Sequence, residues 1–389
     1  ARRFLEAEVG AEPVVPVLIL GAARQGKSLL MNLLSGQDDV FKVSNRTEPC
    51  TVGVDLSRRL TTTRHLRRVR TGPAPLSMRP DAAEAEEKAP EKRAEQASQR
   101  GSSWWGSWRA AAAANADSGG SKVVAEKKTP TTTGVLFADA EGQGDRDQQY
   151  DAKLATPGLL AARVVLFNWK DGVVRDRLLN HLGVLARAAA AVKRADDDDD
   201  TRFAAQGGGH AVFGHLVLVF RDWTLASRDA DAVRRRIFEE EREDVGSTKD
   251  ASARNEIRRA LKRAFKSISV ALLPPPARDA RRLSTGLTPA DLSPEFSRAV
   301  DALRESMCDK LDDDDTSRTV HSGRRLSQLI AFYADVLETK GVVVPRSAYR
   351  AVVESDLRAA AKSIEQSARA ELFGGDDKKD VRVLITEAD

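Results

Sequence analysis

Residues 21–28 have the types and the spacing that bind phosphate groups. They read Gly-Ala-Ala-Arg-Gln-Gly-Lys-Ser and fit the pattern G-x-x-x-x-G-K-[ST]. Glycines let such a loop turn tightly and aim its backbone N–H groups at phosphate oxygens, and the N-terminus of a following helix adds partial positive charge. In this chemistry Lys27 would reach the β- and γ-phosphates of a nucleotide, and Ser28 would bind Mg²⁺.

The flanking segments are those that must position such a loop. The apolar run Val14–Leu20 predicts a buried strand. After the loop, leucines recur at helical spacing and Gly36 can end the helix; these leucines are Leu29, Leu30, Leu33 and Leu34. A chance match in a loop rich in glycine and alanine is the alternative. The order strand, loop, helix favours a phosphate-binding loop.

Two later motifs could complete a phosphate site. Thr51 lies before a short predicted strand and could place its hydroxyl on Mg²⁺ and near the γ-phosphate. Asp139 and Gly142 form D-x-x-G directly after the apolar segment 134–138. There the aspartate would orient the metal through water, and the glycine N–H would contact the γ-phosphate. Each motif alone is a weak signal, but their order after a phosphate loop strengthens both.

Arg221-Asp222 follows another apolar strand and is the candidate for recognising the base. A carboxylate can accept two hydrogen bonds, from N1–H and the 2-amino group of guanine, whereas adenine offers no such pair. A surface ion pair between Arg221 and Asp222 is the alternative for these two residues taken alone. The first interpretation predicts a preference for guanine.

The order of the remaining elements predicts an α/β fold. Further strands are expected at 163–168, 215–220 and 268–273, with helices between them at 174–192, 228–244 and 251–267. Alternation of strands and helices is typical of a mostly parallel sheet flanked by helices. The pattern is helical from about residue 294 onward, at 294–309, 325–339 and 346–373, which predicts a helical appendage.

Two biased segments interrupt this order. Residues 58–130 are rich in Arg, Ala, Glu, Ser and Pro without a sustained period, and we expect a disordered insertion. Its three tryptophans could dock on a partner or a membrane surface, or cluster by chance; they are Trp104, Trp105 and Trp108. Residues 194–209 combine an acidic run with three glycines. Such a run is usually a solvated loop rather than a metal site.

Composition narrows the class further. The chain has 389 residues, and its net charge of +4 is too small to argue for nucleic acid as a partner. Two cysteines, Cys50 and Cys308, rule out a disulfide scaffold and fit a reducing compartment such as the cytoplasm. No apolar run approaches the roughly 18 residues of a membrane span. The first residue is Ala1, and the chain is expected to be part of a longer protein.

At these motifs the chain resembles the large GTPases of the guanylate-binding-protein and atlastin type within the dynamin superfamily. Their phosphate loop reads G-x-x-R-x-G-K-S, with Arg24 at the arginine position. Their first switch ends in T-x-G, matched by Thr51-Val52-Gly53, ten residues after Phe41 as in the guanylate-binding branch. Asp139–Gly142 resembles their second switch, and Arg221-Asp222 their Arg-Asp base motif.

The resemblance implies a Mg²⁺-dependent GTP hydrolase. It implies a GTP-binding domain over residues 1–343 and the start of a helical middle domain over 344–389. It implies metal ligation by Ser28 and Thr51, with Asp139 orienting the ion, and catalytic roles for Arg24, Lys27, Thr51 and Glu141. Arg24 would act as an arginine finger in cis, and Glu141 would belong to the water network. The nucleotide contacts it implies are Gly21, Arg24, Gln25, Gly26, Lys27, Ser28, Leu29, Thr51, Asp139, Gly142, Arg221 and Asp222.

The resemblance also implies partners. GTP or GDP would bind, and GTP would drive homodimerisation across the nucleotide face. Two alternatives stay open: an atlastin-type fusion GTPase on the cytosolic face of an internal membrane, whose membrane hairpin lies outside this chain, and a GTP-binding scaffold with little hydrolysis. Whether the final product is GDP or GMP is left undecided.

Four features depart from the family pattern. Ala140 replaces a threonine, and Pro49 stands where the family has a serine thought to help place the attacking water. Pro157-Gly158 is expected to interrupt a helix, and the insertion 58–130 is not a family feature. These departures bear on the rate of hydrolysis more than on nucleotide binding.

Overall fold

The computed structural model describes residues 2–37, 40–43, 53–71, 133–144, 147–170, 175–192, 211–225, 228–241, 248–277, 291–313, 321–341 and 343–373. Its strands are β1 (Pro13–Gly21), β2 (Val54–Leu56), β3 (Gly134–Ala140), β4 (Val164–Trp169), β5 (Phe213–Phe220), β6 (Phe265–Leu272) and β7 (His321–Ser322). Its helices are η1 (Phe4–Val9), α1 (Lys27–Ser35), α2 (Thr63–Leu66), α4 (Gln148–Ala161), α5 (Arg175–Ala190), α6 (Ala230–Phe238), α7 (Thr248–Ala264), α9 (Pro294–Leu311), α10 (Gly323–Thr339) and α11 (Pro345–Phe373).

One mostly parallel sheet organises these elements. Its strand order is β2-β3-β1-β4-β5-β6, and β7 pairs with β1. The strands from β3 to β6 run parallel, whereas β2 and β7 are antiparallel to their neighbours. The register pairs Ile19 with Asp139 and Gly21 with Asn168, so the carboxyl ends of β1, β3 and β4 meet at one edge. The predicted α/β fold class is confirmed.

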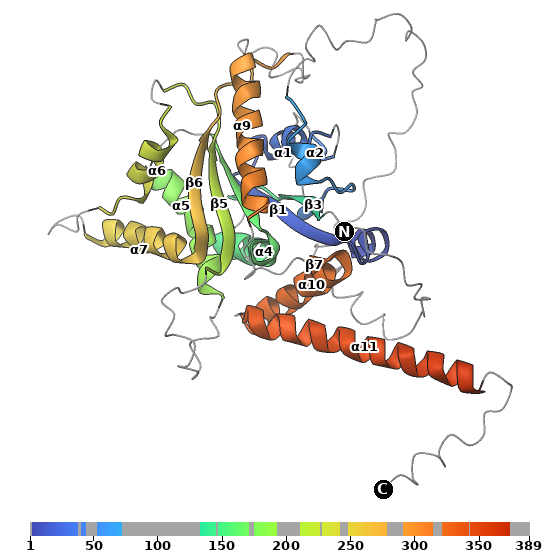
Figure 1. Ribbon diagram of the computed structural model, residues 1–389. Helices are drawn as coiled ribbons and strands as arrows, with labels where there is room; N and C mark the ends of the chain where they lie inside the picture. The colour runs from blue at the N-terminus through green and yellow to red at the C-terminus, as the bar shows by residue number, and fades with distance from the viewer. Residues whose placement is uncertain are drawn as a thin grey trace, which may run out of the picture.

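Helices cover both faces of the sheet (Figure 1). On one face α1, α2 and α9 pack against the strands around Phe137, Leu166 and Phe296. On the other face α4, α5, α6 and α7 enclose a second core around Phe167 and Leu218. Burial on both faces explains why the central strands read as continuous apolar runs rather than as alternating patterns.

Side chains cap several helices and so fix where they begin. Each cap is a short polar residue whose oxygen accepts a backbone N–H of the first turn. These N-cap residues are Thr62, Asp147, Asp229, Ser293 and Ser322. The sequence analysis expected helices at the positions of α6, α9 and α10 without identifying these caps, so the caps refine their boundaries. It expected no continuous helix at α4.

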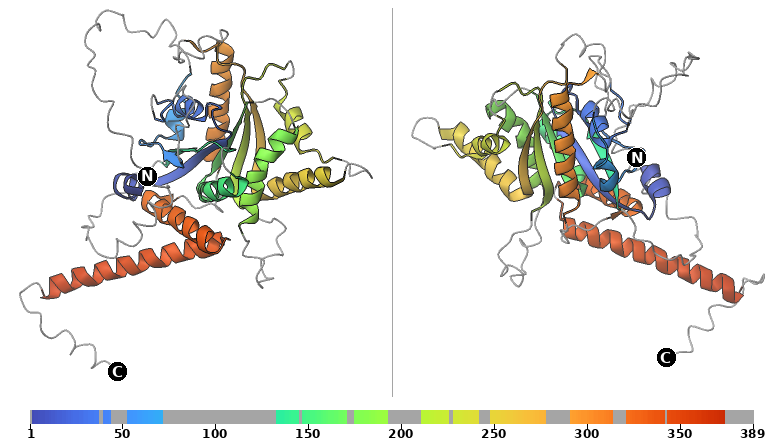
Figure 2. Two further views of the ribbon diagram at one scale, coloured as in Figure 1. Left: turned by 180° about the vertical axis from the view of Figure 1, so that it is seen from behind. Right: turned by 45° about the horizontal axis from the view of Figure 1, so that its top comes forward.

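The C-terminal helices leave the sheet. α10 packs on η1 and on α4, with Leu326 and Ile330 buried against Leu5 and Val9. α11 then contacts α10 at its base and extends away from the body (Figures 1 and 2). Its outer part exposes Leu357 and Ile364. The N-terminal η1 and the short strand β7 had no counterpart in the sequence analysis.

The insertion was predicted to start at residue 58, and this boundary was wrong. Residues 58–71 are folded onto the domain: Thr61 pairs with Val135 of β3, and Leu66 of α2 is fully buried. Arg67 reaches across to α9, where it forms ion pairs with acidic side chains; they are Glu305, Asp309 and Asp312. The biased composition suggested a disordered insertion, but Arg67 has its acidic partners on a helix more than 200 residues away in sequence.

Arg304 of α9 fixes the same region from inside. It is 2% exposed and donates hydrogen bonds to the carbonyl oxygens of Leu33 and Leu34, at the end of α1, and of Val69. The Arg304 guanidinium thus donates hydrogen bonds to carbonyl oxygens at the C-terminus of α1, which have no donor within the helix itself. It joins α1, α9 and the segment after β2.

Pro157 does not interrupt its helix, contrary to the expectation. α4 continues to Ala161, and the N–H of Ala162 donates to the carbonyl oxygen of Gly158 at 2.8 Å. Gly158 packs closely on β1, since a Cβ there would lie 3.1 Å from a methyl carbon of Leu18. The Pro-Gly pair therefore allows a close helix-to-strand contact within an unbroken helix.

Several predicted features lie outside the described residues. They are Pro49, Thr51, the tryptophans 104, 105 and 108, the loop 194–209, and residues 374–389.

Candidate functional site

The loop after β1 lies at the carboxyl edge of the sheet, where open α/β sheets bind ligands. Gly21 has φ 138°, and a Cβ there would lie only 2.1 Å from the carbonyl oxygen of Asn168. Gly26 has φ 71° and forms the N-cap of α1. Both positions require glycine, and together they turn the chain from β1 into α1 with its helix N-terminus at the loop.

Lys27 and Ser28 begin α1 inside this loop. Lys27 is buried and its Nζ donates to the carbonyl oxygens of Gly21 (3.3 Å) and Ala22 (3.1 Å). Ser28 Oγ donates to Oδ2 of Asp139 at 2.5 Å. Because Asp139 is fully buried at the end of β3, this contact joins the phosphate-loop pattern and the D-x-x-G pattern across 111 positions of sequence.

The oxygens of Ser28 and Asp139 fit a magnesium ion. Mg²⁺ prefers oxygen ligands and is often held by few protein groups together with phosphates and water. Among the described residues no group of three His, Cys, Asp or Glu side chains could hold a metal by itself. The donor set is therefore of the kind that binds Mg²⁺ together with a nucleotide. The predicted third ligand, Thr51, lies outside the described residues.

The second switch packs directly on the loop. A Cβ on Gly142 would lie 2.2 Å from the Cα of Ala23, so only glycine fits. Glu141 connects this segment to the end of the first switch: its N–H donates to the Gly53 carbonyl (2.7 Å), and its Oε2 accepts the Gly53 N–H (3.0 Å). The two switches are thus joined beside the phosphate loop.

Arg24 stands at the outer rim of the loop. Its side chain is exposed, and its backbone has φ 59°, a left-handed conformation that is uncommon for a residue other than glycine. Held backbone strain of this kind often marks a functional position. Leu29, also among the expected contacts, lies half-buried in the first turn of α1.

Residues after β4 support the loop from the other side. Asn168 Nδ2 donates to the carbonyl oxygen of Gln25 at 2.9 Å, and the N–H of Lys170 donates to Oε1 of Gln25 at 3.1 Å. The sequence analysis did not find Asn168 and Lys170. The only available signal was their place at the end of a predicted strand.

Arg221 serves the loop rather than the surface. It is 6% exposed, its Nη1 donates to the Gly26 carbonyl at 3.2 Å, and its guanidinium lies 5.7 Å from the ring centre of Phe296. Burial lowers the pKa of the Arg221 guanidinium, and the neighbouring charge of Asp222 partly offsets this. The sequence analysis had assigned Phe296 no role.

Asp222 faces the other way. It has φ 53°, and its Oδ2 lies 3.2 Å from Nζ of Lys170. The surface ion pair considered for Arg221-Asp222 is therefore made with Lys170 instead. The carboxylate keeps 27% of its side chain exposed, beside the loop that holds Gln25.

A comparison with known protein families gives the family of this chain. A family model described as the guanylate-binding protein N-terminal domain matches residues 99–315, more than half of the chain. The chain belongs to the guanylate-binding protein family. The matched range contains Asp139, Gly142, Arg221 and Asp222, whereas the phosphate loop precedes it. No curated protein matches the chain. The match shows that the fold is the GTP-binding domain of GTPases of this family.

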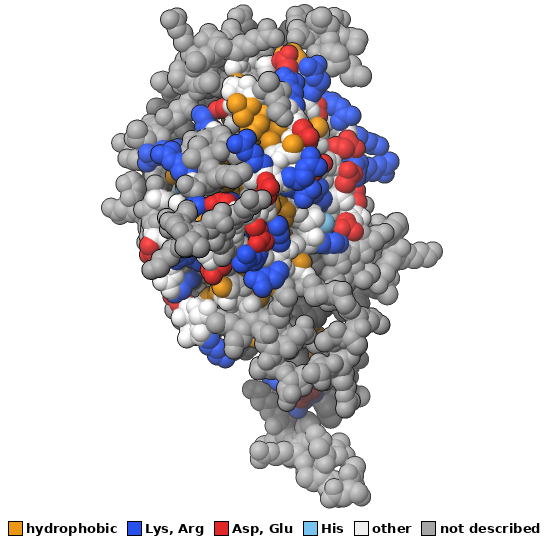
Figure 3. Space-filling view, turned by 90° about the vertical axis from the view of Figure 1, so that its left-hand side faces the viewer, with side chains coloured by type: hydrophobic (Ala, Val, Ile, Leu, Met, Phe, Trp, Pro, Cys, Tyr) orange, Lys and Arg blue, Asp and Glu red, His pale blue; other side chains and the backbone are white. Residues whose placement is uncertain are grey.

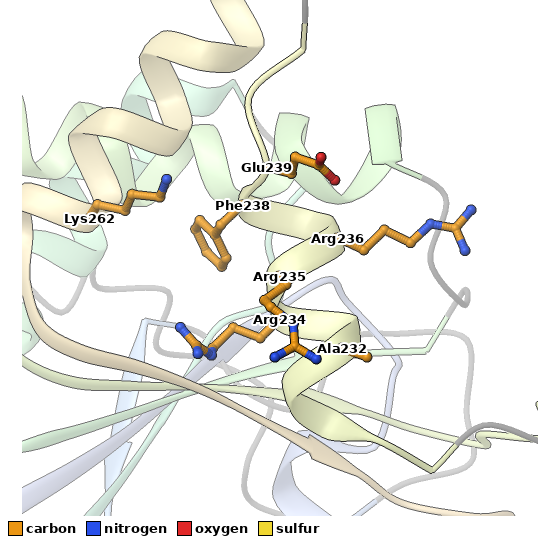
Figure 4. A pocket seen from close by; sticks show the side chains of 7 residues that line it. All are labelled: Ala232, Arg234, Arg235, Arg236, Phe238, Glu239 and Lys262. Atoms are coloured by element: carbon orange, nitrogen blue, oxygen red, sulfur yellow. The ribbon is translucent and has the colours of Figure 1, made fainter.

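A surface hollow elsewhere on this guanylate-binding domain belongs to a different region. It has about 800 Å³ of open space between α6 and α7, and Lys262 comes from α7 while the other lining residues come from α6 and its C-cap (Figure 4). Its arginines are partly neutralised, since Arg234 pairs with Asp231 and Arg235 with Asp229. Figure 3 shows this side of the molecule, where basic and acidic side chains are mixed. None of the phosphate-loop or switch residues lines the hollow.

No helix in the described parts of the chain has both the length and the apolar character needed to cross a membrane.

Proposed function

We propose that this chain is a Mg²⁺-dependent GTP hydrolase of the guanylate-binding type. The observation that carries the proposal is the 2.5 Å hydrogen bond from Ser28 Oγ to Asp139 Oδ2. It brings a hydroxyl that follows the phosphate-loop lysine against the carboxylate of the second switch. In phosphate-loop GTPases these two positions hold the metal that bridges the β- and γ-phosphates.

Each residue has a stated role in this proposal. Lys27 exchanges its carbonyl partners in the loop for β- and γ-phosphate oxygens, and the loop N–H groups bind the same phosphates. Ser28, Thr51 and Asp139 hold Mg²⁺. Asp222 accepts hydrogen bonds from guanine, and Arg24 stabilises charge that develops on the transferring phosphoryl group.

Dimerisation across the nucleotide face belongs to the same proposal. The exposed, left-handed position of Arg24 supports it, because a partner on this face would aim an arginine that solvent otherwise surrounds. We place the protein in the cytoplasm.

Nucleotide titration tests the proposal. A fluorescent non-hydrolysable GTP analogue should bind the unmutated chain in Mg²⁺, bind more weakly in EDTA, and be displaced by GTP but not by ATP. Lys27→Ala should abolish binding, whereas the matched change Lys42→Ala, at an exposed position beyond α1, should leave it unchanged. Equal displacement by ATP and GTP would overturn the assignment.

A GTP-binding scaffold with slow hydrolysis is the second candidate, and Ala140 favours it. Ala140 is 1% exposed and packs in the core, where the family's threonine would carry a hydroxyl. Single-turnover measurement of GTP cleavage separates the two candidates. Binding without cleavage over hours would support the scaffold.

A further inference from the structure

Gln143 lies directly after Gly142, and its backbone is hydrogen-bonded to the phosphate loop. Its N–H donates to the carbonyl oxygen of Gly21 at 3.0 Å, and its carbonyl accepts the N–H of Ala23 at 3.2 Å. These two bonds continue the parallel pairing of β3 with β1 into the loop, where Ala22 faces Gln143. The side chain therefore starts beside the residues that surround the phosphates in the proposed function.

The Gln143 amide is buried without using its hydrogen-bonding groups. The residue is 4% exposed, and neither Oε1 nor Nε2 has a hydrogen-bond partner among the described residues. A buried amide left in this condition costs on the order of 1–3 kcal/mol. A leucine at this position would avoid this cost. A buried amide without hydrogen-bond partners therefore needs an explanation, and a catalytic role is one explanation.

The chain on either side holds Gln143 in place. Gly142 is in backbone contact with Ala23, as described above, and the N–H of Gly144 donates to Oδ2 of Asp151 in α4 at 3.0 Å. Gly144 itself has φ 98°, a conformation that favours glycine. The backbone of Gln143 is therefore fixed relative to the loop, and so is the point from which its side chain extends.

We propose that Gln143 orients the water molecule that attacks the γ-phosphate of GTP. The inference rests on the proposed GTPase function and adds a specific role to it. An amide carries both an acceptor and donors, so Oε1 can accept from the water while Nε2 donates to a γ-phosphate oxygen. A glutamine has this water-orienting task in other phosphate-loop GTPases.

The step balances without a base from Gln143. The water oxygen forms a bond to the γ-phosphorus, and the bond from that phosphorus to the β,γ-bridging oxygen breaks. The water proton passes to a γ-phosphate oxygen, and the products are GDP and inorganic phosphate. Glu141, the neighbouring carboxylate, has its Oε2 on the Gly53 N–H. Pro49 has no side-chain group that could hold water.

Three variants test the role. Gln143→Leu removes the amide at similar size, Gln143→Asn keeps an amide but withdraws it by one methylene, and Gln149→Leu makes the same chemical change at an exposed position on α4. We expect kcat to fall by about 10- to 100-fold in both Gln143 variants, because misplacement by about 1 Å can cost 100-fold. The Kd of a non-hydrolysable GTP analogue should stay within about threefold. Gln149→Leu should match the unmutated chain.

Thermal unfolding provides a second readout. Gln143→Leu should be at least as stable as the unmutated chain, since it removes a buried amide without partners. Unchanged kcat in Gln143→Leu, with GTP still hydrolysed, would overturn this inference and leave the proposed function intact. A loss of analogue affinity as large as the loss of kcat would also overturn it, because the residue would then act in binding. If the unmutated chain binds no GTP, the proposed function itself is wrong.

Discussion

Arg221 and Gly26 are 195 positions apart, yet Nη1 of Arg221 donates to the Gly26 carbonyl at 3.2 Å. The bond connects the residue after β5 to the N-cap residue of α1. Asp222, the side chain expected to recognise the base, follows Arg221 directly. The segment that holds the phosphate loop therefore also positions Asp222. The Arg-Asp pair thus combines a buried arginine that holds the loop with a partly exposed aspartate, to which the proposed function assigns the base.

Arg221→Met should weaken nucleotide binding. The methionine keeps an unbranched side chain against Phe296 but removes the donor to Gly26. Hydrogen bonds made by charged groups contribute about 1.5–3 kcal/mol, which corresponds to a roughly tenfold or larger rise in the Kd for GTP. Arg228→Met, at an exposed position, is the matched control. If Kd does not change, the contact does not hold the loop.

Asp222→Asn should change base preference. The new amide can donate to the 2-oxo group of xanthine, and it loses the second acceptor that guanine needs. Sites built around such hydrogen bonds can discriminate by roughly 10⁴. Competition binding with GTP and XTP measures the shift. Unchanged GTP affinity without a gain for XTP would remove Asp222 from base recognition.

Arg24→Ala should lower turnover and spare binding. An arginine finger contributes on the order of 10³ or more to turnover, and its charge matters most in the transition state. Specific activity of the unmutated chain should rise with protein concentration as dimers form, and this rise should vanish in the variant. If Arg24→Ala hydrolyses GTP at the unmutated rate, the arginine-finger assignment is wrong. Lys27 and the metal would then have to stabilise the transition-state charge alone.

Replacing residues 72–132 with a short Gly-Ser linker should keep GTP affinity within a few-fold. The flanking segments are fixed independently, because Thr61 pairs with Val135 and Arg67 is bound to α9. A longer deletion of residues 60–128 should lower the melting temperature, since it removes Leu66 from the core and Arg67 from its ion pairs. Equal stability of the two deletions would contradict the anchoring of residues 60–71.

Glu241→Gln should destabilise the chain in a pH-dependent way. Hydrogen bonds from Arg254 and Arg258 lower the pKa of Glu241 to about 2 from 4.5. A lowered pKa means that the carboxylate stabilises the fold fully above about pH 4.5 and loses this contribution as the pH falls toward 2. The variant should lose about 1–3 kcal/mol at pH 7, because Arg258 is fully buried.

Melting temperatures between pH 7 and about pH 2 measure this effect, because the carboxylate loses its contribution between its unfolded and folded pKa values. The gap between Glu241→Gln and the unmutated chain should narrow at the acidic end. Glu240→Gln, at an ion pair with Arg259 in which both side chains are about half exposed, should change the melting temperature little at any pH. A constant gap across the range would mean that Glu241 acts through packing rather than charge.

Local pattern was enough to predict the sheet and the turn from β1 into α1. Apolar runs marked β1, β3, β4 and β5, and glycine spacing marked the turn into α1, because these signals depend on neighbours in sequence. Asn168, Gln143 and Phe296 were missed because what singles them out is their contacts or burial in the fold. The span 58–71 was misjudged for the same reason, since Arg67 finds its partners on α9.

The same limit explains the errors in local detail. A proline inside a helix pattern predicts a break, yet Pro157 lies within α4, where the packing of Gly158 on β1 decides the outcome. β7 has only two residues and pairs through its backbone, so its sequence carries no strand pattern.

α11 gives the domain a lever. Its 29 residues correspond to about 43 Å of helix, and in the described part of the chain its main contacts are with α10, near the base of α11. α10 packs on α4, and α4 holds the second switch through Asp151 and Gly144. A tilt of about 5° at the base would carry the far end through about 4 Å. A small shift of the segment around Gly144 would thus become a displacement of several ångströms at the far end of α11.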